Sequence, residues 1–163
     1  MPMEIRRNVR GIAHDTDVAR ITLVRVPDRP GVAAAIFQPL AEANISVDTI
    51  AQSSGADGTT DLSFTVSRGS LERAMQITDT VAPRIGAAAV DTADDLAKVS
   101  IVGTGMQSAP GYAARMFGIL ARAGINIAII STSDIKITCV VPRDRAADAV
   151  RVLHTAFELD RED

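Results

Sequence analysis

The chain has 163 residues, of which 47% are hydrophobic and 23% charged, a balance typical of a folded globular protein. Its 17 basic and 20 acidic side chains give a formal net charge of −3, and the basic residues are scattered along the sequence. Binding to nucleic acid needs a basic patch or stacking aromatic rings, and aromatic residues make up only 3% of this chain. We therefore expect no nucleic-acid partner.

The cysteine count and the hydrophobic runs bear on the cellular compartment. The single cysteine, Cys139, cannot form an internal disulfide. It lies in residues 135–141, where apolar and polar side chains alternate, and this pattern predicts a buried thiol without chemistry. The N-terminal segment lacks the apolar stretch of a secretory signal, and no apolar run is long enough to span a bilayer. We expect a cytoplasmic protein that does not enter a membrane.

The first half of the chain predicts six elements in the order βαββαβ. Apolar β-branched runs predict strands, apolar residues at helical spacing predict helices, and Pro-Gly, Ser-Gly and Asp-Gly pairs mark turns. The elements are a strand over 21–26, a helix over 31–43, strands over 45–52 and 60–66, a helix starting near Leu71, and a strand over 87–90. Pro83 and Gly86 are expected to break the second helix before the last strand.

The second half predicts the same order without its last strand. Its elements are a strand over 99–102, a helix over 110–123, a hairpin of strands over 127–131 and 135–141, and a helix from Ala146 to Phe157. The strand-like residues 9–15 have no place in the first unit, and we expect them to supply the missing strand. The domains are therefore expected at 18–94 and 95–163, with residues 8–16 adding a strand to the second.

An internal repeat supports this division into two units. Each copy runs from a basic residue through an apolar strand, a Pro-Gly pair and an Ala-rich helix to an Asn-Ile pair; the copies are residues 20–44 and 98–126. The Pro-Gly pairs at 30–31 and 110–111 lie 80 positions apart, and the Asn-Ile pairs at 44–45 and 126–127 lie 82 apart. This displacement is too long for a solenoid repeat and fits duplication of a small α+β unit.

Catalytic signatures are largely missing from the sequence. Gly103-Thr-Gly105 resembles the start of a dinucleotide-binding loop, but Ser108 replaces the third glycine, so we interpret the segment as a tight strand-to-helix loop. His14 and His154 are isolated from any ligand-spaced Cys, Asp or Glu, and no Walker-type phosphate loop occurs. We expect no catalysis, no cofactor and no metal site.

The two strand-to-helix loops are the best candidate binding sites. Each places a helix start beside a glycine, Gly31 or Gly111, where free backbone N–H groups and the positive end of the helix dipole hold an anion such as a carboxylate. Asp28 adds a carboxylate that pairs with an ammonium group, so a free α-amino acid satisfies both. The alternative is that Asp28 or Ser108 merely caps its helix.

Polar residues interrupt the second strand of each unit. They are Asp48 and Gln52 in the first copy and Ser131, Ser133 and Asp134 in the second. Such groups need hydrogen-bond partners where they are buried. They orient a ligand side chain or satisfy the hairpin backbone, and the sequence leaves both interpretations open.

Four stretches of the chain, in order, closely resemble the tandem ACT domains at the C-terminal end of aspartate kinases. They are ITLVRVPDRPG at 21–31, DGTTDLSF at 57–64, KVSIVG at 98–103 and ISTSDIK at 130–136. The resemblance extends from about Gly11 to Leu159. It implies an α+β chain of two ferredoxin-like βαββαβ ACT domains with antiparallel sheets, in which the N-terminal strand completes the second domain.

The resemblance also implies a function. Such domains bind threonine, lysine or both and inhibit aspartate kinase allosterically, as feedback on the aspartate pathway. The chain resembles a separate small regulatory subunit, or the C-terminal half of a kinase cut from its catalytic domain, and is itself not an enzyme. Its implied partners are a catalytic aspartate kinase subunit or domain and a second copy of the chain, paired so that the first unit of one lies against the second unit of the other. A purely structural dimerisation module without ligand is the alternative.

The resemblance implies effector-binding residues in both units. They are Asp28, Pro30, Gly31, Val32, Ala33 and Gln52 in the first copy and Asn126, Ile127, Ser131 and Asp134 in the second. Relatives commonly carry an acidic or amide residue after the second Asn-Ile pair, whereas this chain has Ala128. This departure leaves the choice between threonine and lysine open.

Overall fold

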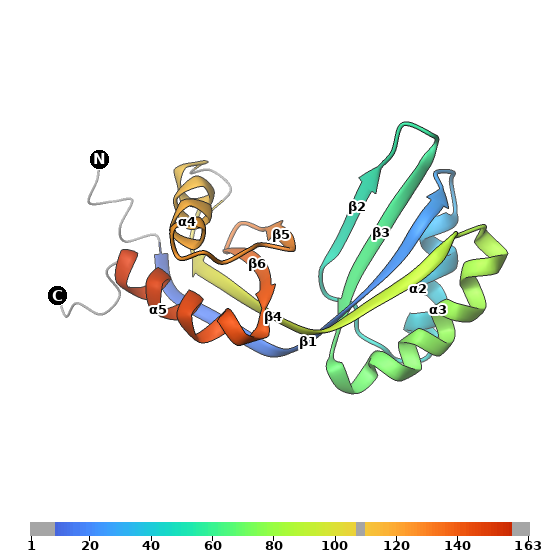
Figure 1. Cartoon of the computed structure of the whole chain (residues 1–163), viewed down its shortest axis with the longest axis horizontal. Helices are drawn as coiled ribbons and strands as arrows, with labels where there is room; N and C mark the ends of the chain where they lie inside the picture. The colour runs from blue at the N-terminus through green and yellow to red at the C-terminus, as the bar shows by residue number, and fades with distance from the viewer. Residues whose placement is uncertain (1–8, 107–109, 158–163) are drawn as a thin grey trace. The chain divides into compact units, whose positions relative to one another are not determined.

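A computed structural model describes residues 9–106 and 110–157, which form two compact units. The first unit is Asp17–Asp94, and the second combines residues 9–16 with residues 95–106 and 110–157. Strands β1 (Val9–Pro27) and β4 (Ala89–Gly103) are long enough to take part in both units (Figure 1). Each unit therefore uses one part of each of these two strands.

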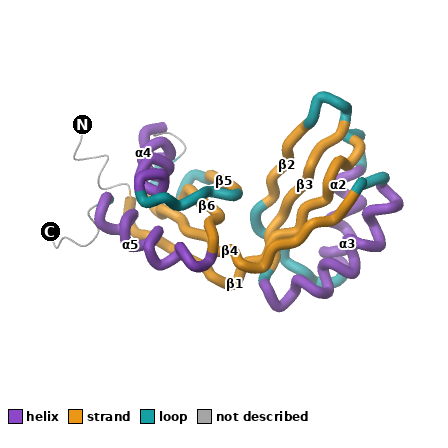
Figure 2. Tube along the Cα trace, viewed as in Figure 1, coloured by secondary structure: helices purple, strands orange, loops and turns teal. Residues whose placement is uncertain are grey.

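The first unit is a sheet with two helices packed on one face (Figure 2). The strands lie in the order β2-β3-β1-β4, and β3 pairs antiparallel with both of its neighbours. In chain order after β1, the elements are α2 (Val32–Glu42), β2 (Ile50–Ser54), β3 (Thr59–Val66), the 3-10 turn η1 (Arg68–Ser70) and α3 (Leu71–Ile85). This is the ferredoxin-like βαββαβ arrangement.

The second unit repeats this arrangement with the N-terminal part of β1 as its closing strand. Its strands lie in the order β1-β4-β6-β5, with β6 antiparallel to β4 and β5. After β4 the elements are α4 (Pro110–Arg122), β5 (Ile129–Thr132), β6 (Lys136–Pro142), the 3-10 turn η2 (Arg143–Arg145) and α5 (Ala146–Ala156). The predicted pair of ferredoxin-like units, with the N-terminal strand completing the second, is confirmed.

The core of the first unit follows from two periodicities. Alternate residues of β1, such as Ile21 and Leu23, point to the helix-covered face and are fully buried. Ile36 and Leu40 recur at helical spacing on α2 and are also fully buried beside Phe64 of β3. Burial of each such side chain contributes about 1.5–3 kcal/mol. These contacts fix the end of β1 relative to the start of α2.

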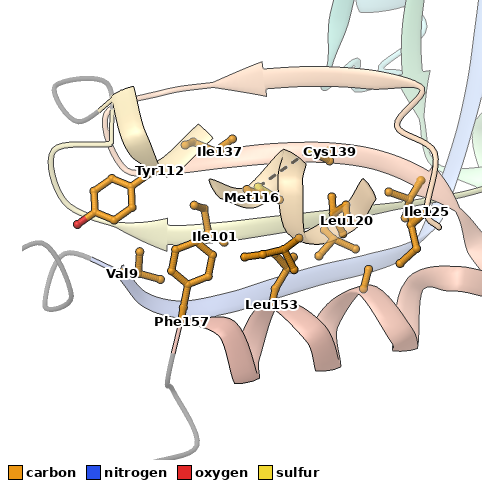
Figure 3. Close-up of a cluster of buried hydrophobic side chains, with 14 of the residues drawn as sticks. Val9, Ile101, Tyr112, Met116, Leu120, Ile125, Ile137, Cys139, Leu153 and Phe157 are labelled. Atoms are coloured by element: carbon orange, nitrogen blue, oxygen red, sulfur yellow. Dashed lines mark hydrogen bonds between the residues drawn. The ribbon is translucent and has the colours of Figure 1, made fainter. Parts of the chain in front are cut away.

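The core of the second unit contains the only cysteine (Figure 3). The Cys139 thiol donates to the sulfur of Met116 at 4.0 Å, between β6 and α4. Burial raises the pKa of this thiol to about 12, so it stays protonated at neutral pH. The predicted buried thiol is therefore confirmed. Val9 also belongs to this core, which explains why the N-terminal strand is needed here.

The long strands differ from the sequence-based prediction. The sequence predicts separate strands over 9–15 and 21–26, and again over 87–90 and 99–102, but each pair belongs to one continuous strand. The joining residues, 16–20 and 91–98, mix charged and polar side chains with the buried apolar pairs Val18-Ala19 and Leu96-Ala97, and they show no regular strand alternation. They are extended because β1 and β4 are hydrogen-bonded neighbours in the sheet. Cross-strand pairing thus overrides local propensity.

The second strand of each unit begins later than predicted. β2 begins at Ile50 rather than at residue 45, and β5 begins at Ile129 rather than at residue 127. The backbone N–H of Asp48 already donates to the carbonyl of Thr65 on β3 at 3.1 Å, so the chain approaches β3 before the regular ladder starts.

Helix α3 continues through Pro83, contrary to the predicted break. Pro83 lies in the last turn, where its missing N–H removes a single helical hydrogen bond. The helix ends at Gly86, whose φ of 80 is the left-handed conformation expected of a terminating glycine. The predicted role of Gly86 is correct, whereas that of Pro83 is wrong.

Candidate functional site

The loop between β1 and α2 is a tight turn. The N–H of Val32 donates to the carbonyl of Arg29 at 3.4 Å, with Pro30 and Gly31 between them. Gly31 has φ 91 and ψ −11, close to the values for the third residue of a type II turn, and proline favours the second position. Only glycine adopts this φ without strain. The Pro-Gly pair is therefore required by the geometry of the turn.

The first turn of α2 presents backbone N–H groups to solvent. The helical ladder starts where Ala35 donates to the Gly31 carbonyl at 3.0 Å. For the N–H groups of Ala33 and Ala34, no acceptor is found among residues 9–106 and 110–157. Both alanines and Gly31 are exposed. Two free donors at the positive end of a helix dipole suit a carboxylate.

Asp28 does not cap α2. The residue at the N-cap position is Gly31, and no side-chain cap hydrogen bond is present there. The Asp28 side chain is exposed, and its backbone N–H donates to the carbonyl of Gly58 at 3.0 Å. The capping interpretation is therefore wrong for Asp28, and its carboxylate is accessible to a ligand. Its counterpart Ser108 lies outside the described residues.

Gln52 lies on the β2–β3 hairpin, whose turn is hydrogen-bonded to the β1–α2 loop that carries Asp28. It pairs with Leu62 of β3, and directly opposed residues point to the same face of a sheet. Since Leu62 is buried in the core, Gln52 lies on the helix-covered face at the outer strand. The hydrogen bond between Asp28 and Gly58 joins the hairpin turn to the β1–α2 loop. Gln52 and Asp28 thus belong to two connected segments.

The predicted effector-binding residues of the second unit lie at opposite ends of β5. Asn126 and Ile127 lead into this strand, where Asn126 is exposed and Ile127 packs against the core. Ser131 lies near its far end, and Asp134 follows in the exposed β5–β6 turn. The Asp134 carbonyl accepts the N–H of Met106 at 2.9 Å, so this turn contacts the described part of the loop before α4.

The two Asn-Ile pairs are not structural counterparts. Asn44 and Gly124 both end a helix with a positive φ, of 60 and 72. Ile45 and Ile125 then each donate an N–H back to the helix, at 3.0 and 2.9 Å. The offset of 80 positions therefore persists through this turn, and the interpretation of the two Asn-Ile pairs as equivalent parts of the repeat is wrong. Asn126 falls two positions further along the second unit than Asn44 does in the first.

Comparison with known proteins identifies the two units. Residues 20–82 match the ACT domain family, and residues 99–157 match a second family described as an ACT domain. The ligand-free regulatory subunit of aspartate kinase from Thermus thermophilus is 40% identical with a TM-score of 0.87, and the match covers 92% of this chain and 99% of that one. This chain belongs to the aspartate kinase regulatory subunits. It carries two ACT domains.

Further relatives set the extent of the match. A crystal structure of aspartokinase alpha and beta subunits is 48% identical with a TM-score of 0.86, and the match covers 92% of this chain and 99% of that one. The aspartate kinase of Stutzerimonas stutzeri is 47% identical over 152 residues, 93% of this chain but 37% of that relative. The chain therefore corresponds to the regulatory region, and the catalytic part of the longer relatives lies outside the match.

A bulge in the first ACT domain was missed by the sequence interpretation. The β1–β3 register shifts between Leu23 and Val26, so two residues of β1 oppose Asp61 of β3. One of them, Arg25, has φ 49, and its N–H donates to Asp61 Oδ1 at 2.8 Å. No glycine marks this position in the sequence, so no local signal predicts a left-handed residue there.

The described residues also bear on other features that a chain can carry, namely a metal site, a membrane-spanning helix and a ligand cavity. Within residues 9–106 and 110–157, no three His, Cys, Asp or Glu side chains gather as metal ligands would. No helix in the same ranges combines the length and apolar character needed to cross a membrane. A cavity of about 320 Å³ in the second unit is lined by Asp95, Arg143 and Asp144, and it includes none of the predicted effector residues.

Proposed function

We propose that this chain is the amino-acid sensor of an aspartate kinase. It binds free threonine, lysine or both and transmits the signal to a catalytic subunit or domain as allosteric feedback inhibition. The observation that carries the proposal is the exposed Asp28 carboxylate beside the uncapped start of α2. An α-amino acid is a zwitterion, and this pair of features offers one partner for each of its charges.

The backbone of the β1–α2 turn recognises the α-carboxylate. The free N–H groups of Ala33 and Ala34 donate to it, while Val32 is buried and anchors the turn. Open space surrounds Gly31, since a Cβ placed there would meet nothing within 4 Å. Asp28 then holds the α-ammonium, which excludes simple carboxylic acids as equally good ligands.

The side chain of the effector is recognised by polar groups from both ACT domains. The amide of Gln52 hydrogen-bonds either a hydroxyl or an ammonium group. Asn126, Ile127 and Ser131 suit the hydroxyl and methyl of threonine, whereas the carboxylate of Asp134 suits the terminal ammonium of lysine. The effector preference therefore depends on which of these second-domain residues reaches the ligand.

A second copy of the chain supplies the second-domain residues. β2 is the outer strand of the first unit and β5 that of the second, so each leaves one strand edge unpaired within its unit. Equivalent isoleucines on these strands, Ile50 and Ile130, are 53% and 50% exposed. Pairing the first unit of one chain with the second unit of another covers both side chains and completes two symmetric effector sites.

A more distant relative supports the ligand class. Aspartokinase III of E. coli has been solved in complex with lysine and aspartate in its T-state, and with aspartate and ADP in its R-state. The lysine-bound structure is 26% identical with a TM-score of 0.70, and the match covers 91% of this chain and 33% of that one. By analogy, an effector that binds one state better shifts the population toward it.

Isothermal titration of the full chain with L-threonine and L-lysine tests the proposal. We expect saturable binding, absent for the D-isomers, and a stabilisation of about 2.7 kcal/mol at a ligand concentration of 100 Kd. Asp28→Asn should abolish binding, because it removes the charge that holds the ammonium. The matched control is Asp79→Asn, which changes an exposed acid on α3. A stable dimer that binds none of the twenty amino acids would instead support a purely structural module.

A further inference from the structure

The bulge in β1 changes which side chains face the core directly before the β1–α2 loop, residues 28–31, which we call the effector loop. Ile21 and Leu23 point into the core, and regular alternation would place Arg25 there next. Because the bulge inserts one residue, Val26 is buried instead and Arg25 is exposed. The bulge therefore decides which residues of β1 face the core and which face solvent where the strand leads into the effector loop.

The bulge places a non-glycine residue in a strained conformation. Arg25 has φ 49, in the left-handed region that costs a residue with a side chain about 1–2 kcal/mol. Its N–H can no longer join the ladder to β3, and the carboxylate of Asp61 accepts it at 2.8 Å. On the other side of the bulge, the carbonyl of Val24 accepts the N–H of Ala88 at 2.8 Å. Asp61 is therefore the one side chain that satisfies the displaced N–H.

Two hydrogen bonds join the effector loop to the β2–β3 hairpin. One runs from Arg25 to the side chain of Asp61, and the other from Asp28 to the carbonyl of Gly58 at 3.0 Å. The ladder pairs of Val26 and Pro27 lie between them. If the first bond is lost, Arg25 relaxes toward ordinary strand geometry, and the segment ending at Asp28 shifts with it.

We infer that Asp61 is a positioning residue of the effector site. It holds Arg25 in the left-handed conformation and so presents Asp28 and the start of α2 in the geometry that fits an α-amino acid. It touches no ligand itself. This inference rests on the proposed function, because it explains how that same site is kept ready for its effector.

Titration of variants of the full chain with L-threonine and L-lysine tests the inference. Asp61→Ala should raise Kd about tenfold, the change that corresponds to 1.4 kcal/mol. Asp61→Asn keeps an oxygen acceptor and should stay within about threefold of the parent. Adding Arg25→Gly to Asp61→Ala should restore affinity, because glycine holds the left-handed conformation without the carboxylate. Asp79→Ala is the control for loss of an exposed acid elsewhere on the first unit.

Amide hydrogen exchange separates this inference from the proposed function. In the free chain, Asp61→Ala should speed exchange at Arg25 and Asp28 while the amides of α3 remain protected. Unchanged Kd and unchanged exchange in Asp61→Ala would overturn the inference even if Asp28→Asn abolishes binding. If the parent chain binds no amino acid, the proposed function fails and the inference that rests on it fails too, and exchange then reports only whether Asp61 holds Arg25 in the left-handed conformation. If Asp61→Ala does not fold, Asp61→Ser provides the same test.

Discussion

The guanidinium of Arg145 donates to the carbonyl of Ala123 at 2.9 Å and to that of Gly124 at 3.4 Å. Arg145 ends the 3-10 turn before α5, whereas both carbonyls lie at the end of α4. Its Nε also lies 3.4 Å from Asp148 Oδ2 on α5. One cation thus satisfies the free carbonyls of one helix and orients the start of another.

Replacement of Arg145 by alanine should destabilise the second ACT domain. The loss of two charge-assisted hydrogen bonds at a helix C-terminus is expected to cost about 1–2 kcal/mol. Arg151→Ala is a suitable control, because Arg151 is exposed and bonds Asp148 across one helical turn, at 3.3 Å. Thermal unfolding should show a lower Tm for Arg145→Ala and little change for Arg151→Ala. Equal Tm values for both variants would contradict this role of Arg145.

Gly31→Ala should lower both stability and effector affinity. Alanine at φ 91 is strained by about 1–2 kcal/mol, although the site has space for a Cβ. Relaxation of the strain turns the N–H groups of Ala33 and Ala34 away from a bound carboxylate. Gly118→Ala is the matched control, since Gly118 lies within α4 and its new Cβ would make only an ordinary contact of 3.8 Å. That control should be neutral or stabilising by up to about 1 kcal/mol, measured by urea unfolding.

The parts of the fold that the sequence predicts are those with a strong local pattern. The predicted Pro-Gly turn at Gly31 and the predicted helix end at Gly86 are confirmed, because each needs a positive φ, which glycine adopts without strain. The buried faces of β1 and α2 follow from periods of 2 and 3.6 residues. The N-terminal strand is predicted because the second unit otherwise lacks its sixth element.

The features that the sequence does not predict depend on contacts between distant segments. The residues that join the predicted strands, 16–20 and 91–98, are extended because β1 and β4 pair with each other, not because of their own propensity. The left-handed Arg25 is stabilised by Asp61, 36 positions away. Alignment of the two Asn-Ile pairs places the units two residues out of register, because the structural counterpart of Asn44 is Gly124, which forms the same turn with a different residue type. At the candidate site, the sequence marked Asp28 but left capping open, and the uncapped helix start decides against it.

Cys139 should be unreactive in the folded chain. Burial raises the pKa of its thiol to about 12, so almost no thiolate is present at pH 8. A thiol reagent such as Ellman's reagent should label the chain only as fast as it unfolds. Rapid labelling of the native chain at pH 8 would contradict the burial of this residue.

The same pKa shift predicts a pH dependence of stability. The ordinary thiol pKa is 9.0 and the folded value is about 12, so the unfolded chain loses this proton first as the pH rises. The contribution to stability is complete below pH 9.0 and declines as the pH rises toward about 12. The parent should therefore lose stability relative to Cys139→Ala over this range, as measured by urea unfolding. Parallel curves for the two proteins would contradict it.

Deletion of residues 1–15 should unfold the second ACT domain before the first. The deletion removes Val9 and Ile12 from the second core and leaves β4 without a neighbour on one side. It spares Asp17, whose carboxylate accepts the N–H of Arg68 at 2.9 Å in the first unit. Amide exchange should therefore lose protection in α4 and α5 while α2 and α3 stay protected. The reciprocal variant is Asp17→Ala in the full chain, which should loosen only the start of α3. A truncated chain that keeps full protection in α4 and α5 would show that β4 is stable there without its N-terminal neighbour.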